Sequence, residues 1–391
     1  MLGWLKRDRT PLQGTSTSVL PDELVVDILS RLPLKSICRF KCVCKSWLAF
    51  SSHTYYRQKL PRTPAGLLYR KRVVGTAIHL ARLPAGDREI DTSLNFVPPR
   101  YKDTELLGCS NGLLLCNQGG NKREAIYNAV VCNPATKEWM EIPDTEPGPP
   151  ICSTDIRLCF DPLWSQDFYV FKFQSIPHMI PHIGTTTEVE VFFSENSSWS
   201  GCLWETEHAF VDESLFVNGV LYVMHLWDHK ILALDAPDTS SQWLNHRIIQ
   251  LPGFTNGADT FNCCDGCLCQ SSGLLCYAKQ ELDGCAVRIW SLESPDEWVV
   301  KQRVRMTGVF GRDVLINTGR EGYWYFDYDI LAFDLERDLV ILVDTKADKI
   351  ISVSISTGKG SQFVKIPEKF TELHHSLFYV PYYGEVPALV R

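Results

Sequence analysis

The chain has 391 residues, of which 45% are hydrophobic and 22% are charged, and this composition is ordinary for a soluble globular protein. Its net charge of −7 divides unevenly, because residues 1–60 carry +6 and residues 61–391 carry −13. A nucleic-acid-binding domain would show a basic stripe, so the acidic larger part argues against DNA or RNA and favours partners with basic character. No apolar run approaches the roughly eighteen residues of a membrane span, so no membrane partner is expected.

Residues 1–19 contain Lys6, Arg7 and Arg9 but no apolar run that would suit a signal peptide. We expect a disordered leader there. The fifteen cysteines are spread through apolar segments, which is typical of reduced and mostly buried thiols rather than of a disulfide scaffold. The expected compartment is therefore the cytoplasm or the nucleus.

The segment 20–62 has the pattern of a small helical module. Pro21 and the two acidic residues after it suit the first turn of a helix, where carboxylates face the positive end of the helix dipole. Leu24, Ile28 and Leu32 then recur every fourth residue and form an apolar stripe. A proline ends this helix, and two further short helices are expected before residue 50. Three short helices bury too little surface to make a core of their own, so some apolar side chains should stay available for a partner.

Four motifs in this module stand in the order and at the spacing of an F-box: Leu-Pro, Ile-Leu, Leu-Pro-Leu and Val-Cys-Lys-Ser-Trp. The segment resembles that family, and the resemblance implies docking onto the Skp-type adaptor of a cullin–RING ubiquitin ligase. The adaptor-facing positions that it implies are Leu20, Pro21, Ile28, Leu32, Pro33, Leu34, Val43 and Trp47. The alternative is a helical bundle that packs on the rest of the chain, which this ordered set of motifs disfavours.

Beyond Gly66 the apolar runs become short, and Gly, Asn, Asp and Pro interrupt them every ten residues or so, as in an all-β domain. A unit recurs there: a strand opened by glycine, a polar turn, a second strand, a tryptophan and a closing strand that ends in proline. Its clearest copies carry Trp139, Trp243 and Trp298. Two related copies lie around residues 168–199 and 339–367.

Five imperfect copies, spaced about 45 to 65 residues apart, suit the blades of a propeller. The remaining segments 66–96 and 376–390 are expected to combine into a sixth, closing blade. The predicted fold is therefore a multi-domain α+β chain: a three-helix F-box module followed over residues 66–391 by a large all-β, propeller-like domain of about six blades. A β-sandwich is the main alternative, but it would not need a tryptophan at one place in each unit.

The β domain resembles the kelch-like, F-box-associated domain of plant F-box proteins. The most family-like piece is the Asn-Pro-Ala-Thr run at 133–136, followed by a tryptophan and a strand that ends in Ile-Pro. The chain departs from true kelch repeats because the Gly-Gly pair that closes their strand is missing. The number of blades and the closure of the ring stay open at this point.

The residue patterns that could indicate a metal site or a catalytic site are weak. Cys264 and Cys267 have zinc-knuckle spacing, but no second pair recurs with that spacing, and a structural zinc ion needs four converging ligands. His178 and His182 are four residues apart, but prolines break any helix there. No nucleophile elbow, phosphate-binding loop or paired carboxylate set is present. We expect no metal, no cofactor and no catalytic residues.

What remains is a recognition surface on the turns between the first two strands of each unit, which should emerge on one rim. The candidate target-binding residues on that rim are Arg123, Trp227, Asp228, His229, Asp283 and Lys346. The sequence thus favours a non-catalytic substrate-recognition subunit of an SCF-type (Skp–cullin–F-box) ubiquitin ligase with an unknown target protein. The alternative is an F-box scaffold or sequestering factor that binds the adaptor without directing turnover.

Overall fold

The protein is described from a computed structural model. The described residues are 24–25, 28, 65–71, 77–83, 90–101, 104–118, 129–143, 153–176, 186–205, 213–225, 229–237, 244–254, 266–318, 324–365, 369 and 373–390. The chain divides into two compact units, Met1–Pro61 and Arg62–Arg391. In the first unit only Leu24, Val25 and Ile28 are described, and all three are helical, so the expected second and third helices lie outside the described residues.

The second unit contains five four-stranded antiparallel sheets among its described residues, each built from consecutive strands. Blade 1 is β3 (Thr104–Ser110), β4 (Leu113–Gln118), β5 (Ala129–Asn133) and β6 (Glu138–Ile142); blade 2 is β7 (Ser153–Cys159), β8 (Tyr169–Ile176), β9 (Thr186–Phe193) and β10 (Ser198–Glu205); blade 3 is β11 (Ser214–Val217), β12 (Val220–His225), β13 (Lys230–Asp235) and β14 (His246–Gln250); blade 4 is β15 (Cys267–Ser271), β16 (Leu274–Gln280), β17 (Ala286–Ser294) and β18 (Glu297–Arg305); blade 5 is β21 (Tyr328–Asp334), β22 (Leu339–Asp344), β23 (Lys349–Ser354) and β24 (Gly360–Lys365).

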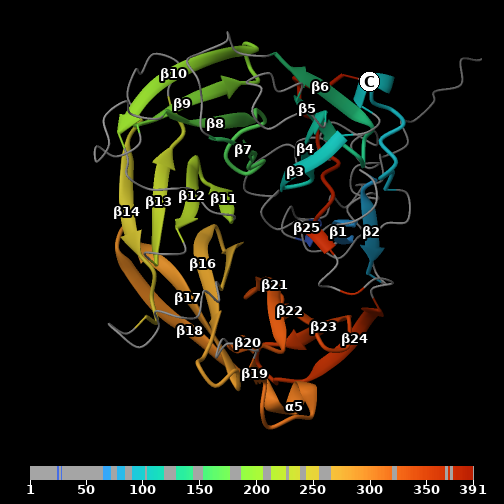
Figure 1. The fold of residues 1–391 in the computed structure, drawn as a ribbon, viewed down its shortest axis with the longest axis vertical. Coiled ribbons are helices and arrows are strands. Elements are labelled where there is room, and N and C mark those ends of the chain that lie inside the picture. The colour runs from blue at the N-terminus through green and yellow to red at the C-terminus, as the bar shows by residue number, and fades with distance from the viewer. Residues whose placement is uncertain are drawn as a thin grey trace, which may run out of the picture. The chain divides into compact units, whose positions relative to one another are not determined.

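A three-stranded sheet completes the ring. It joins β1 (Gly66–Lys71) and β2 (His79–Arg82) to β25 (Leu373–Tyr379), with β25 as the innermost strand. The innermost strands of successive blades contact one another around the whole ring, and β25 lies between those of blades 5 and 1 (Figure 1). The unit is therefore a six-bladed β-propeller, closed, as expected, by a blade that combines an early and a late segment of the chain.

The glycine that marks each unit lies in a tight hairpin. Asn111 and Gly112 have φ angles of 43° and 91°, and Asn218 and Gly219 have φ angles of 51° and 80°. Two successive positive φ angles define the hairpin turn that matches the twist of β-strands, and asparagine followed by glycine is its preferred sequence. Each turn joins the first and second strands of its blade, so the glycine-opened strand is the second strand and not the first. The inner strand before it carries no such marker and was not predicted.

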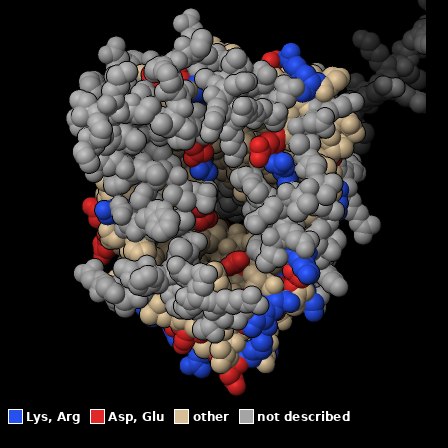
Figure 2. Space-filling model, in the orientation of Figure 1, with Lys and Arg blue, Asp and Glu red and all other residues tan. Residues whose placement is uncertain are grey.

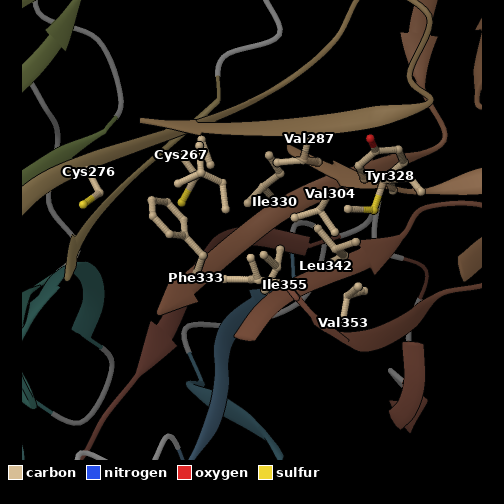
Figure 3. Packing of buried hydrophobic residues seen from close by; sticks show 14 of the residues in the cluster. Cys267, Cys276, Val287, Val304, Tyr328, Ile330, Phe333, Leu342, Val353 and Ile355 are labelled. Carbon is tan, nitrogen blue, oxygen red and sulfur yellow. The ribbon is translucent and has the colours of Figure 1, made fainter. Parts of the chain in front are cut away.

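Apolar faces of neighbouring blades meet in dry clusters. Between blades 4 and 5, Val287 and Val304 lie opposite Ile330 and Leu342, with Phe333 at one end of the cluster (Figure 3). All five side chains are at most 9% exposed. Each sheet is thus covered by its neighbours, which is how a propeller buries strands that no single blade could cover.

The recurring tryptophan links neighbouring blades. On the outer strand of blade 2, Trp199 donates its indole N–H to the carbonyl of Pro143, just after the outer strand of blade 1, over 2.7 Å. On the outer strand of blade 4, Trp298 donates to the carbonyl of Gln250, at the end of the outer strand of blade 3, over 2.9 Å. The tryptophan and the proline-ended strand therefore belong to one repeated contact between blades, which explains why they recur together.

Residues 380–390, which follow β25, form a segment that we call the strap. Val386 and Leu389 are 2% and 7% exposed and pack among the apolar residues of blades 1 and 2. Val390 pairs with Trp139 on the outer strand of blade 1 through two backbone hydrogen bonds of 2.8 and 2.9 Å. The strap thus fastens the last strand of the closing blade to blade 1.

The connection from blade 4 to blade 5 contains extra structure that the sequence reading did not predict. It holds the short helix α5 (Thr307–Phe310) and the hairpin of β19 (Ile316–Thr318) and β20 (Trp324–Phe326). A single 3-10 turn, Pro99–Tyr101, precedes blade 1. Within the described part of the chain, no helix combines the length and the apolar composition needed to cross a bilayer.

Candidate functional site

The expected adaptor-facing surface begins with the first helix. Leu24 and Ile28, one helical turn apart, are 51% and 47% exposed, whereas Val25 between them is 8% exposed. Large apolar side chains that stay exposed on one side of a helix mark a surface that a partner can cover. Ile28 is one of the expected adaptor-facing residues. The others lie outside the described residues: Leu20, Pro21, Leu32, Pro33, Leu34, Val43 and Trp47.

The expected target-binding turns join the second and third strands of their blades. Because every blade has the same strand order, these turns emerge at one end of the propeller. His229, Asp283 and Lys346 are described and lie on them, whereas Arg123, Trp227 and Asp228 lie outside the described residues. The turn of blade 4 spans residues 281–285, between β16, which ends at Gln280, and β17, which begins at Ala286.

His229 belongs to a stacked group rather than to an open turn. Its ring lies on that of Phe254 with 3.7 Å between ring centroids, and the ammonium of Lys279 lies 3.2 Å from the centroid of the same phenylalanine ring. The His229 carbonyl accepts hydrogen bonds from the backbone of Leu251 and the side chain of Gln250. His229 therefore fixes the connection that leaves blade 3.

Lys346 lies over a buried carboxylate. Its ammonium is 2.7 Å from a carboxylate oxygen of Asp327, whose side chain is 1% exposed. Arg312 approaches the same oxygen at 3.9 Å and pairs with Asp344 at 3.4 Å. A buried carboxylate without a cation is costly, so Lys346 stabilises the start of blade 5 in addition to facing solvent. Asp283 is exposed, and its carboxylate accepts a hydrogen bond from the backbone N–H of Cys285, which shapes the turn.

Acidic side chains lie around the hollow at the centre of the ring (Figure 2). Glu105, Asp155 and Asp329 each stand at the second or third residue of an inner strand. Glu105 pairs with Arg70 at 2.9 Å, and Asp155 pairs with Arg157 at 2.6 Å. Asp329 remains accessible to solvent but is closely surrounded by protein, and this loss of hydration raises its pKa from 3.8 to about 6. These three carboxylates were not predicted as site residues, because the inner strands that carry them lack the glycine and tryptophan markers.

The described cysteines are poorly suited to nucleophilic or metal chemistry. Burial raises the pKa of Cys109 and of Cys276 to about 12, so both thiols stay protonated at neutral pH. Cys267 lies in β15, with its sulfur 3.8 Å from that of Cys269. Cys264 and both histidines of the 178–182 pair lie outside the described residues. Among the side chains that are described, no group of three or more His, Cys, Asp or Glu is placed to hold a metal ion.

Several exposed residues of the rim were not anticipated. Leu282, next to Asp283, is 52% exposed, and Val314 and Tyr325 on the connection between blades 4 and 5 are 68% and 59% exposed. Single-residue patterns give no signal for them, because an apolar residue in a turn is exposed or buried according to what packs against that turn.

Comparison with known proteins identifies both parts of the chain. The F-box domain family matches residues 18–58, and the family described as F-box protein At3g26010-like, beta-propeller, matches residues 90–359. Three relatives from Arabidopsis thaliana are similar: F-box protein At5g49610 (33% identity over 34% of this chain), F-box protein At1g47340 (27% over 52%) and F-box protein At1g53790 (23% over 59%).

These matches span 35%, 48% and 54% of the relatives' own lengths, in that order. The expected resemblance to kelch repeats is not confirmed by the two matching families, which are described as an F-box domain and an At3g26010-like β-propeller. The propeller match alone extends over more than half of the chain and covers blades 1 to 4 and the first three strands of blade 5. The chain therefore belongs to the F-box proteins with an At3g26010-like β-propeller.

Proposed function

We propose that this F-box protein is the substrate-recognition subunit of an SCF-type ubiquitin ligase. The F-box module at residues 20–62 binds the Skp-type adaptor, and through it the cullin and the RING protein, while the propeller binds a target protein. The observation that carries the proposal is the presence of an F-box match at residues 18–58 and a propeller match at residues 90–359 in one chain. The exposed Leu24 and Ile28 support the adaptor-binding role.

The mechanism that we propose is proximity. A target held on the propeller and a ubiquitin-conjugating enzyme held by the rest of the ligase meet within one assembly, so an encounter between two molecules becomes an intramolecular one with a high effective concentration. In this mechanism the chain itself needs no cofactor and no catalytic residue. Such an assembly would act in the cytoplasm or the nucleus.

The adaptor-binding role is tested by replacing Leu20, Pro21 and Leu32 together with alanine. We expect the variant to lose co-purification with the Skp-type adaptor while its propeller keeps the thermal unfolding transition of the wild type. Retained adaptor binding would refute the docking assignment.

Turnover is tested separately by comparing the abundance of captured partners with and without a proteasome inhibitor. A partner that accumulates only when the proteasome is inhibited, and only with an intact F-box, supports the ligase role. A partner whose abundance is unchanged would instead make the chain an F-box scaffold or sequestering factor.

A further inference from the structure

The loop 160–168, which joins the first and second strands of blade 2, is held in place by one buried side chain. Asp161 is fully buried, and its carboxylate accepts the backbone N–H of Asn218, in the β11–β12 hairpin of blade 3, at 3.0 Å. The Asp161 carbonyl accepts the backbone N–H of Trp164, also at 3.0 Å. The position of Trp164 is therefore fixed both within its own loop and against the next blade.

Trp164 projects from this loop to the surface. Its side chain is 44% exposed, and among the tryptophans whose side chains are described it alone is exposed. Part of the indole packs on the hairpin of blade 3, since a Cβ on Gly219 would lie 2.7 Å from the ring. The ring centroids of Tyr169 and Phe216 each lie 5.6 Å from that of Trp164. The indole is thus held by an aromatic group while much of its surface stays open to solvent, as in the aromatic anchors of protein interfaces.

Two carboxylates lie beside this aromatic group. Asp167 belongs to the same loop, and its carboxylate accepts the Ser194 hydroxyl at 3.4 Å, which places the next residue, the exposed Glu195, beside the loop. Burial raises the pKa of Tyr169, and the negative charges of Asp167 and Glu195 raise it further, so both carboxylates act on the aromatic group. Neither carboxylate forms an ion pair within the described structure.

The charge of this sector has one sign. The sector is built from three segments, all of them described throughout: 160–168, 194–197 and 218–219. Together they contain Asp161, Asp167 and Glu195 and no Lys, Arg or His, which gives a net charge of −3. The Asp161 carboxylate is used inside the fold, so two negative charges remain for a ligand that covers the indole. Their sign agrees with the acidic balance of the larger part of the chain.

We propose that Trp164, Asp167 and Glu195, which we call the Trp164 site, dock a basic segment of the target polypeptide. A lysine or arginine side chain would lie over the face of the indole, and the two carboxylates would accept hydrogen bonds from its N–H groups. The negative face of an aromatic ring attracts such a cation, and tryptophan attracts it most strongly. Charge complementarity selects this occupant, because an acidic segment would meet two unpaired carboxylates. The assignment rests on the proposed function, because it names a target-binding surface of the propeller.

The Trp164 site lies at the opposite end of the propeller from the target-binding turns that the sequence predicted. Its loops join the first strand to the second and the third to the fourth, whereas the predicted turns join the second to the third. In an antiparallel sheet these two kinds of turn emerge at opposite ends of the strands. Changes at the predicted turns should therefore leave binding at the Trp164 site intact.

A display library of random peptides, selected on the whole chain, tests the assignment. We expect enrichment of peptides that are rich in Lys and Arg. Their affinity should fall about tenfold on Trp164→Ala, which removes the ring that the cation covers. It should stay within about twofold on Tyr325→Ala, a matched control that removes a 59% exposed ring from the connection between blades 4 and 5.

A second variant keeps the indole and removes only the charges. The double change Asp167→Asn, Glu195→Gln should weaken the selected peptides about fivefold at low salt and should flatten the salt dependence of their binding. The control Asp296→Asn, Glu336→Gln removes two exposed carboxylates from turns of blades 4 and 5 and should leave the affinity within about twofold of the wild type. This pair of variants tests the assignment even where Trp164→Ala disturbs the loop.

Other outcomes would overturn the assignment. These are a selection that yields no binder, a selection of acidic or uncharged peptides, or basic peptides that bind the charge variant and its control equally well. Light scattering supplies a further check, since a dimer of the chain that Trp164→Ala dissociates would assign the surface to a second copy. Adaptor co-purification is measured on the same preparations. A chain that binds the adaptor but no basic peptide refutes the Trp164 site alone, whereas one that binds the peptides but not the adaptor refutes the ligase role.

Discussion

Replacing Leu389 by alanine tests whether the strap holds the propeller ring closed. The Leu389 side chain is 7% exposed in the cluster between blades 1 and 2. The change removes groups equivalent to three methylenes, each contributing about 0.8 kcal/mol of burial, or about 2.4 kcal/mol in all. The cavity left behind adds to this, so we expect a loss of about 3 kcal/mol in the free energy of unfolding, within the range of about 2–5 kcal/mol for such changes.

Thermal unfolding followed by circular dichroism measures the effect. For a unit of the size of Arg62–Arg391, the unfolding entropy is ~0.7 kcal/mol per kelvin, so a loss of about 3 kcal/mol lowers Tm by about 4 °C. Leu274→Ala is the matched control, because the same atoms are removed from a side chain that is 36% exposed. If Leu389→Ala and Leu274→Ala lower Tm equally, the strap does not fasten the ring and the reasoning is refuted.

Two further changes test other contacts by thermal unfolding. Trp298→Phe removes the indole N–H that links blades 3 and 4. It should lower the free energy of unfolding by about 1 kcal/mol more than Trp139→Phe, because the Trp139 indole donates no hydrogen bond within the described structure. Equal losses for the two variants would contradict a stabilising role for the Trp298 hydrogen bond. Asp329→Asn should raise Tm at pH 7.5, because the folded state disfavours the ionised carboxylate, and the gain should shrink as pH falls from about 6 towards 3.8. A gain that is the same at both ends of this range would contradict the raised pKa.

The sequence allowed the propeller to be predicted because its markers are local. Asn111-Gly112 and Asn218-Gly219 can be recognised from their own chemistry, since few other pairs accept two positive φ angles. Trp199 and Trp298 stand at equivalent positions because blades 2 and 4 make the same contact with the blade before them. The closing blade followed from the two segments left over when the repeats had been assigned.

What the sequence did not reveal depends on contacts between distant residues. The inner strand β15 was not predicted, because a strand of five residues without a glycine or tryptophan marker has no signal of its own. The exposure of Leu282 is set by the packing of its turn against Met306, Leu315 and Tyr328, which are neighbours only in the fold. Lys346 was expected to face a target, but its position over the buried Asp327 gives it a structural role as well.

The most direct test of the central claim is the affinity of the whole chain for the Skp-type adaptor, measured by isothermal titration calorimetry. Ile28 is 47% exposed on the F-box helix, and Ile248 is 50% exposed on the propeller, so Ile28→Asp and Ile248→Asp make the same change at equally exposed sites. We predict that Ile28→Asp weakens adaptor binding at least tenfold and that Ile248→Asp leaves it unchanged. Binding of the Ile28→Asp variant with the affinity of the wild type would contradict it.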